Sequence, residues 1–126
     1  MDCLFCKIAK KEISAEVVYE DEAAMAILDI HPRAPGHAFV IPKAHAANLT
    51  ELPDELIEPL FKAVKKVATL LKDKVKADGI TVGINQGRAS GQEVDHLHVH
   101  ILPRFMGDGG GSVQSVVNNP RGKFKV

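Results

Sequence analysis

Three histidines at every second position form the pattern in this sequence that points most specifically to chemistry. They are His96, His98 and His100 in the run His-Leu-His-Val-His. Side chains alternate between the two faces of a strand, so the three imidazoles share one face at a spacing of about 6.8 Å. The intervening apolar residues face the other way and can enter a core. A strand with this pattern could instead bind a metal, or could simply expose polar histidines.

Nucleophilic catalysis is the chemistry that this row favours. A neutral imidazole is a good nucleophile, and its ordinary pKa of about 6.5 keeps it largely neutral at pH 7. It attacks through one ring nitrogen, so a neighbouring acceptor must hold the proton on the other nitrogen. A second histidine can then exchange a proton with the reacting group. His98 is the best nucleophile candidate, because a histidine flanks it on each side.

The two cysteines, Cys3 and Cys6, form a C-x-x-C pair near the N-terminus. A structural disulfide is unexpected in a cytoplasmic chain, which leaves metal binding or redox chemistry. Zinc sites usually take four ligands, so this pair could supply half of one. Thioredoxin-like activity is less favoured, because the strand expected before such a pair is missing.

Size and composition predict a single domain over residues 1–126, with a core in 3–105 and an irregular tail in 106–126. The chain has 16 basic and 16 acidic residues. A protein that binds long nucleic acids usually carries a basic excess, so such a partner is not expected. The sequence shows neither an apolar run of about 20 residues nor a signal-like start, so we expect a cytoplasmic protein that does not bind membranes.

The hydrophobic patterns predict an α+β fold with a mainly antiparallel five-stranded sheet, one long helix and a short N-terminal helix. The long helix should begin near residue 58, after a turn at 53–57, and Gly79 should stop it. A glycine-rich loop over 86–92 could bring backbone N–H groups close to an anion. The short helix is expected at 3–11 and the strands at 17–19, 25–28, 37–41, 80–85 and 97–103.

The sequence resembles the histidine triad family, and specifically its Hint-type branch and prokaryotic relatives. His-Leu-His-Val-His-Ile-Leu matches the family signature of three histidines that alternate with apolar residues. The resemblance covers roughly residues 3 to 105. Further matching stretches are FCKIAKKE at 5–12, YEDE at 19–22, LDI at 28–30, APGH at 34–37, VIPK at 40–43 and GQEV at 91–94.

The resemblance implies an enzyme, a hydrolase or transferase that acts at the α-phosphate of purine nucleotides such as nucleoside phosphoramidates. His98 would form a covalent nucleotidyl-histidine, with the backbone at or beside His96 fixing its tautomer. His100 would interact at the phosphate, and His37 would support it. The substrate-binding residues implied are Asp29 for the ribose hydroxyls, Asn85, Gln92 and the backbone of Glu93 for the phosphate, and Leu4, Phe5, Ile8, Ile27 and Ile30 for the base.

The resemblance also implies a structural zinc site. Prokaryotic members with the N-terminal cysteine pair complete the site with the equivalents of His45 and of the first triad histidine. The ligand set implied for this chain is Cys3, Cys6, His45 and His96. Such a site would connect the N-terminal helix to the sheet, and would leave His98 and His100 for the chemistry.

The sequence leaves the leaving group open. Glu93 stands where many Hint-type members carry a small hydroxyl residue, and Leu102-Pro103-Arg104 resembles both the bacterial and the Fhit-type pattern. Hydrolysis of dinucleoside polyphosphates is therefore an alternative activity, and a non-catalytic nucleotide- or zinc-binding interaction protein is an alternative of another class. Family members commonly pair through an exposed sheet edge, so the resemblance implies a homodimer with a continuous ten-stranded sheet.

Overall fold

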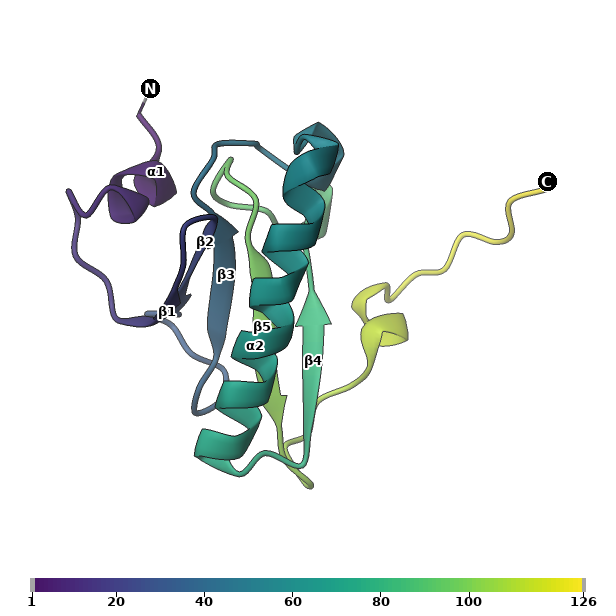
Figure 1. The fold of residues 1–126 in the computed structure, drawn as a ribbon. Helices are drawn as coiled ribbons and strands as arrows, with labels where there is room; N and C mark the ends of the chain where they lie inside the picture. The colour runs from purple at the N-terminus through teal and green to yellow at the C-terminus, as the bar shows by residue number, and fades with distance from the viewer. Residues whose placement is uncertain (1, 126) are drawn as a thin grey trace.

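A computed structural model describes residues 2–125 and places five antiparallel strands in one sheet, in the order β1-β2-β3-β5-β4. Helix α2 (Ile57–Val75) crosses one face of the sheet, and the short α1 (Leu4–Ala9) packs near β2 and β3 (Figure 1). The predicted α+β fold is confirmed. No helix within residues 2–125 is long and apolar enough to cross a membrane. The strands are β1 (Val17–Glu20), β2 (Ala24–Leu28), β3 (Ala38–Pro42), β4 (Gly79–Gly83) and β5 (Val99–Arg104).

The sheet buries apolar side chains on both faces, because successive residues of β2 and β3 point to opposite sides. One core lies between the sheet and α2, and the other lies between the sheet and α1. The first includes Ala24, Ala26, Ala38, Val40, Leu97, Val99 and Ile101 of the sheet side, and Leu60, Val64, Val67 and Leu71 of α2. The second includes Met25, Ile27, Phe39 and Ile41, with Phe5 and Ile8 of α1.

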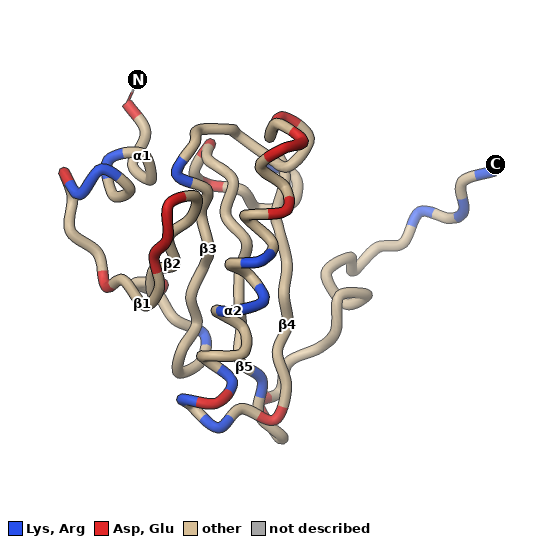
Figure 2. Tube along the Cα trace, in the orientation of Figure 1, with Lys and Arg blue, Asp and Glu red and all other residues tan. Residues whose placement is uncertain are grey.

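Helix α2 buries a stripe of apolar residues at three- and four-residue spacing, a pattern typical of an amphipathic helix. A 3-10 turn over Asp54–Leu56 precedes the helix, which begins at Ile57, one residue from the predicted start. Its basic residues lie along the exposed side (Figure 2). The prediction of Gly79 as the stop is wrong. The chain turns at Lys76, whose φ of 56° is left-handed and whose N–H bonds to the carbonyl of Lys72, and Gly79 instead begins β4.

Strand β5 begins at Val99, two residues later than predicted, so His96 and His98 precede it. The segment before β5 lies outside the sheet. There the N–H of Leu97 donates to the carbonyl of Ala46, in the loop after β3, at 2.8 Å. Pairing between β4 and β5 likewise ends with Gly83 opposite His100, which is why β4 is shorter than predicted. The alternation of faces nevertheless continues, since Leu97 is buried with Val99 in the core beneath α2.

A tight turn at Gly36 places His37 directly before β3. The prediction put His37 inside the strand, but the strand begins at Ala38. Gly36 has a φ of 82°, and the N–H of His37 donates to the carbonyl of Ala34 at 3.1 Å. A β-carbon at Gly36 would lie 3.1 Å from Cγ1 of Val75, so both conformation and space favour glycine here.

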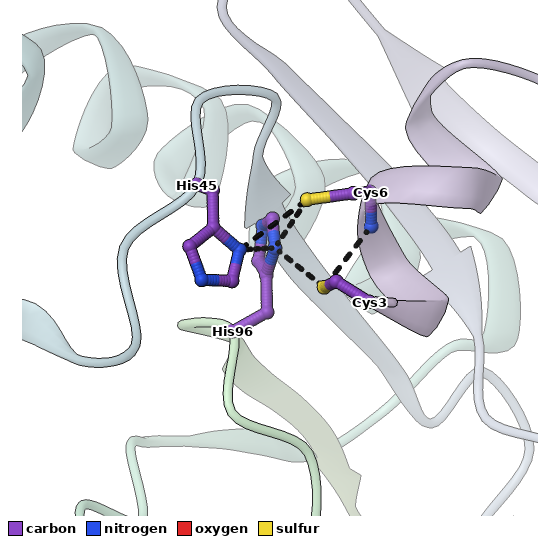
Figure 3. Close-up of side chains that lie close together, drawn as sticks. All are labelled: Cys3, Cys6, His45 and His96. Carbon is purple, nitrogen blue, oxygen red and sulfur yellow. Dashed lines mark hydrogen bonds between the residues drawn. The ribbon is translucent and has the colours of Figure 1, made fainter. Parts of the chain in front are cut away.

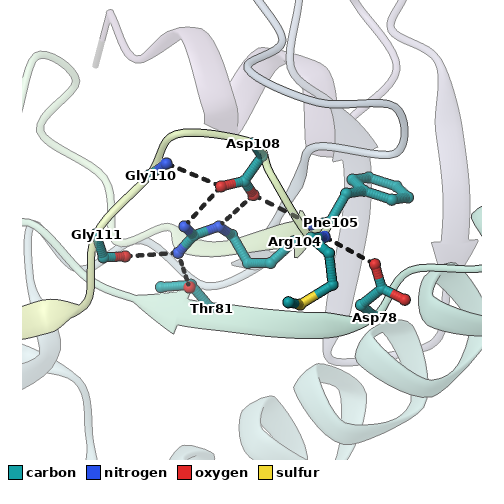
Figure 4. Close-up of polar contacts among 8 residues, drawn as sticks. Asp78, Thr81, Arg104, Phe105, Asp108, Gly110 and Gly111 are labelled. Carbon is teal, nitrogen blue, oxygen red and sulfur yellow. Dashed lines mark hydrogen bonds and ion pairs between the residues drawn. The ribbon is translucent and has the colours of Figure 1, made fainter.

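The end of β5 is tied to the loop that follows it by Arg104 (Figure 4). Its guanidinium donates to both carboxylate oxygens of Asp108, at 2.8 and 3.0 Å, and also to Thr81 Oγ1 and to the carbonyl of Gly111. This guanidinium holds the pKa of the Asp108 carboxyl well below its usual range. Residues 106–125 are exposed and mostly irregular, apart from a 3-10 turn at Val113–Val116.

Candidate functional site

Two cysteines and two histidines from distant parts of the sequence converge beside α1 (Figure 3). Nδ1 of His96 lies 3.4 Å from Sγ of Cys3, 3.5 Å from Sγ of Cys6 and 3.2 Å from Nδ1 of His45. Sγ of Cys6 lies 3.3 Å from Nδ1 of His45. The structure therefore brings together all four residues of the predicted ligand set, in a group that could hold a metal ion.

The donor atoms of this group fit a tetrahedral metal. Bonds of about 2.3 Å to sulfur and about 2.0–2.1 Å to nitrogen separate neighbouring ligand atoms by roughly 3.3–3.8 Å, close to the distances seen here. Nε2 of His96 donates to the carbonyl of Pro42 at 2.8 Å, which leaves the lone pair on Nδ1 toward the group. Burial raises the pKa of the Cys6 thiol, and a bound cation would oppose that shift by favouring the thiolate.

A second group of histidines, His37, His98 and His100, lies next to His96. Nδ1 of His98 donates to the carbonyl of His96 at 2.8 Å. Nδ1 of His100 lies 3.2 Å from Nε2 of His37, and this nitrogen is also 3.5 Å from a carboxylate oxygen of Asp29. The ring centroids of His98 and His100 are 5.2 Å apart, and the rings of Phe5 and Phe39 pack against His98.

Burial keeps the imidazoles of His37 and His100 neutral near pH 7. It lowers the pKa of His100 to about 4, and the neighbouring His98 and His37 add to that shift. The pKa of His37 is also lowered, by burial first, with Asp29 opposing the shift. A neutral imidazole offers one N–H and one lone pair, so the role of each ring nitrogen is set by its partner.

An open cavity of about 880 Å³ lies in front of His98 and His100. The predicted base pocket and most of the predicted polar ligands border it. The residues predicted from the sequence that line it are Leu4, Phe5, Ile8, Ile27, Asp29, Ile30, Asn85, Glu93, His98 and His100. His37 lines a second hollow of about 450 Å³, and Asp29 lines both.

Gln92 is the exception among the predicted phosphate ligands, because it does not line the cavity. Its side chain is buried and holds the glycine-rich loop together. The amide nitrogen donates to the carbonyls of Ala47 and Val94, at 2.7 and 3.0 Å, and the amide oxygen accepts the N–H of Gly87 at 2.8 Å. All three bonds are internal to the protein, so the side chain positions the loop and is not free for a ligand.

Several groups of the site are not evident from the sequence. Phe39 lines the cavity, and its period-two position after His37 in the predicted strand was a signal that could have found it. The backbone groups at Pro42 and Arg33, which bond to His96 and His37, carry no sequence signal. Every residue has the same N–H and carbonyl, and only the fold decides which of them meet a histidine.

Comparison with known proteins agrees with this geometry. The sequence matches the HIT domain family over residues 10–107. It is 50% identical over 107 residues to the uncharacterised HIT-like protein MJ0866 of Methanocaldococcus jannaschii, covering 85% of this chain and 82% of that protein. It is 41% identical over 102 residues to the adenosine 5'-monophosphoramidase HNT1 of Saccharomyces cerevisiae, covering 81% of this chain and 62% of the yeast protein.

A solved structure shares the fold as well. The crystal structure of a zinc-bound histidine triad family protein from Mycobacterium smegmatis superposes with a TM-score of 0.81 at 39% identity, covering 86% of this chain and 79% of that one. The family match spans most of the chain and includes the three alternating histidines. The chain therefore belongs to the HIT domain family.

Proposed function

We propose that the protein is a hydrolase of purine nucleoside phosphoramidates, with His98 as the nucleophile. The observation that carries this proposal is the hydrogen bond from His98 Nδ1 to the carbonyl of His96 at 2.8 Å. A carbonyl can only accept, so Nδ1 carries the proton and Nε2 keeps its lone pair. That nitrogen belongs to a residue lining the 880 Å³ cavity, which is large enough for a nucleotide.

The reaction would proceed in two displacements. Nε2 of His98 attacks the α-phosphorus, the bond from phosphorus to the leaving amine breaks, and the amine nitrogen takes up a proton from solvent. Water then attacks the nucleotidyl-histidine and releases a nucleoside monophosphate, which restores the imidazole. Asp29 would accept hydrogen bonds from the ribose hydroxyls. The base would pack against the apolar side of the cavity, which includes Phe5 and Ile27.

The charge of the cavity favours an amine over a polyphosphate as leaving group. Three carboxylates, those of Glu16, Asp29 and Glu93, line it, whereas its lining residues include no lysine or arginine. Arg88 of the adjoining loop is engaged with Asp95 and with the carbonyl of Gln92. Each added phosphate charge a few ångströms from a carboxylate costs about 1 kcal/mol at high effective dielectric. The similarity to the yeast phosphoramidase supports the same choice, and with it the Hint-type branch.

Replacement of His98 by alanine tests the proposal. The wild type should hydrolyse adenosine 5'-phosphoramidate, and His98→Ala should lower kcat by at least about 1,000-fold because the nucleophile is lost. Calorimetric titration should show that AMP binding survives within a few-fold, and rapid quenching should trap a nucleotide adduct on the wild type alone. A wild type that turns over neither this substrate nor diadenosine polyphosphates would leave the non-catalytic binding protein as the better interpretation.

Substitution of Glu93 separates the two candidate substrates. Glu93→Gln removes one negative charge from the cavity, so kcat/KM for diadenosine tetraphosphate should rise about fivefold, the equivalent of about 1 kcal/mol. Turnover of a phosphoramidate with a neutral amine should change by less than about twofold. Glu55→Gln is the matched control, because Glu55 is exposed and lies away from the cavity. A wild type that prefers the polyphosphate would contradict the assignment.

We further propose that Cys3, Cys6, His45 and His96 bind structural zinc. The fit of the four donor atoms to a tetrahedral ion supports this, as does the similarity to a zinc-bound family member. The ion would supply a cross-link between α1, the loop after β3 and the segment that leads into β5. It would also hold Phe5 of α1 against the ring of His98, where the ring centroids are 5.1 Å apart.

Removal of the metal tests this site. Protein purified without added metal should contain about one zinc per chain, and chelation should lower Tm by roughly 10 °C, since a structural ion contributes several kcal/mol to folding. His45→Gln should lose zinc, whereas His31→Gln, which changes an exposed histidine outside the group, should retain it. Elemental analysis and thermal unfolding measure both effects. Substoichiometric zinc that a chelator strips with no change in Tm would rule out the structural role.

We also propose that two copies pair through β4. This strand forms one edge of the sheet and pairs with β5 over five residues without interruption. The opposite edge, β1, has an irregular register between Val17 and Tyr19, a feature that discourages pairing with another strand. Val82 of β4 and Phe61 of α2 are both exposed hydrophobic residues.

Two matched substitutions distinguish the edges. Val82 is 42% exposed on β4 and Val17 is 45% exposed on β1. Val82→Asp should convert a dimer into a monomer, because it places a charge in the proposed interface, whereas Val17→Asp should leave the dimer intact. Sedimentation equilibrium at micromolar concentration measures the mass. A monomeric wild type would remove the proposal, and dissociation by Val17→Asp alone would transfer the interface to β1.

A further inference from the structure

Both ring nitrogens of His37 have a partner. The backbone N–H of Arg33 points to Nδ1 at 3.1 Å, within the turn that leads to Gly36. Nε2 lies 3.2 Å from Nδ1 of His100 and 3.5 Å from the carboxylate of Asp29. The side chain of His37 is only 8% exposed, so water offers little alternative to these partners.

The identity of the first partner decides the tautomer of His37. A backbone N–H can only donate, so Nδ1 must accept and can carry no proton. A neutral imidazole bears one proton, which therefore sits on Nε2. A doubly protonated ring would set two N–H groups against each other at 3.1 Å in a buried place, which agrees with the lowered pKa of His37.

The tautomer of His37 in turn decides that of His100. Since Nε2 of His37 is the donor, Nδ1 of His100 is the acceptor, and the single proton of a neutral His100 must lie on its own Nε2. Nδ1 is occupied by His37, so Nε2 is the ring nitrogen left for the cavity that His100 lines. We propose that the backbone N–H of Arg33 acts through His37 as a positioning group, which fixes His100 with its donor nitrogen available to a ligand in the cavity.

The consequence for catalysis rests on the proposed function. Phosphate oxygens are anionic acceptors, and negative charge on them must be stabilised while the bond to the leaving group breaks. A neutral imidazole in the proposed tautomer donates to such an oxygen, but the other tautomer would turn a lone pair toward it. His100 needs this control because burial keeps it uncharged near pH 7, where protonation cannot supply a second donor.

A metal ion is a competing explanation for this cluster, because donor atoms of Asp29, His37 and His100 lie within 4.8 Å of one another. Binding through Nε2 of His37 would require a lone pair on that nitrogen and would move its proton to Nδ1. The proton would then face the N–H of Arg33. The hydrogen bond from the N–H of Arg33 therefore favours the proposed positioning of His37 and His100, which we call the tautomer relay, over a metal site.

Ring-nitrogen spectra test the relay without any substrate. In protein labelled with ¹⁵N-histidine, long-range proton–nitrogen correlation at pH 7.5 should show His37 and His100 both protonated on Nε2 and bare on Nδ1. Assignment uses His37→Gln and His100→Gln. A wild-type spectrum with either histidine protonated on Nδ1 overturns the proposal, whether or not the protein hydrolyses phosphoramidates.

Substitutions at Arg33 then isolate its backbone N–H. Arg33→Ala and Arg33→Pro both remove the exposed side chain, but only proline removes the N–H. Arg33→Ala should keep the wild-type tautomers, whereas Arg33→Pro should give His37 a mixture of the two. Relative to Arg33→Ala, Arg33→Pro should lower kcat for adenosine 5'-phosphoramidate about fivefold to tenfold, the effect of losing one hydrogen bond.

These experiments distinguish a failure of the tautomer relay from a failure of the proposed hydrolase function. Unchanged tautomers in a folded Arg33→Pro variant, checked by thermal unfolding, would overturn the role of the Arg33 N–H. Should that variant not fold, the wild-type spectrum still decides the tautomers, and Arg33→Ala with altered tautomers would refute the relay. Absence of phosphoramidate hydrolysis by the wild type would instead count against the proposed function and leave the spectroscopic result standing.

Discussion

The site depends on the hydrogen bond from Nε2 of His96 to the carbonyl of Pro42 at 2.8 Å. His96 is fully buried, and this bond directs its other nitrogen to the group of Cys3, Cys6 and His45. Its own carbonyl accepts a hydrogen bond from Nδ1 of His98. One residue therefore joins the metal-binding group to the proposed nucleophile, so a shift of the segment before β5 would disturb both.

Burial decides the protonation state of His96 and of the two neighbouring histidines His37 and His100. It lowers the pKa values of His37, His96 and His100, which keeps the rings neutral and makes the direction of every N–H a structural choice. The protein makes that choice with backbone groups, which have fixed donor or acceptor character. The carbonyls of Pro42 and His96 each accept a hydrogen bond, and the N–H of Arg33 donates one. Side-chain partners could rotate or titrate, whereas these groups are held by the fold.

The cavity in front of these histidines has an apolar part and an acidic part. Helix α1 and strand β2 give an apolar surface with the character of a base pocket, and the three carboxylates make the cavity unfavourable for highly charged anions. The glycine-rich loop completes the cavity, and the buried amide of Gln92 stabilises its shape. The proposed preference for an amine leaving group thus follows from the charge of the lining, while the choice of a nucleotide follows from the histidines and the apolar part.

The sequence by itself determined the features that depend on short-range periodicity. Alternation placed Leu97 and Val99 in a core and the histidines on the opposite side. The spacing of apolar residues predicted α2, and Pro59, which is tolerated only in a first helical turn, located its start within one residue. The row of histidines itself indicated His98 as the nucleophile candidate, and the resemblance to the histidine triad family then implied the ligand set. The inferences from periodicity hold because a strand or helix fixes side-chain directions without reference to the rest of the chain.

Only the tertiary structure decided where long-range partners override local preference. Lys76 ends α2 in a left-handed conformation that favours glycine, and the helix stops before Gly79 is reached. Gln92 has the chemistry of a phosphate ligand, yet its amide is satisfied by Ala47 and Val94. The tautomers of His37 and His100 follow from the N–H of Arg33, a group that every residue but proline possesses. Such choices depend on which backbone atoms meet in space, and no pattern of side chains along the sequence encodes that meeting.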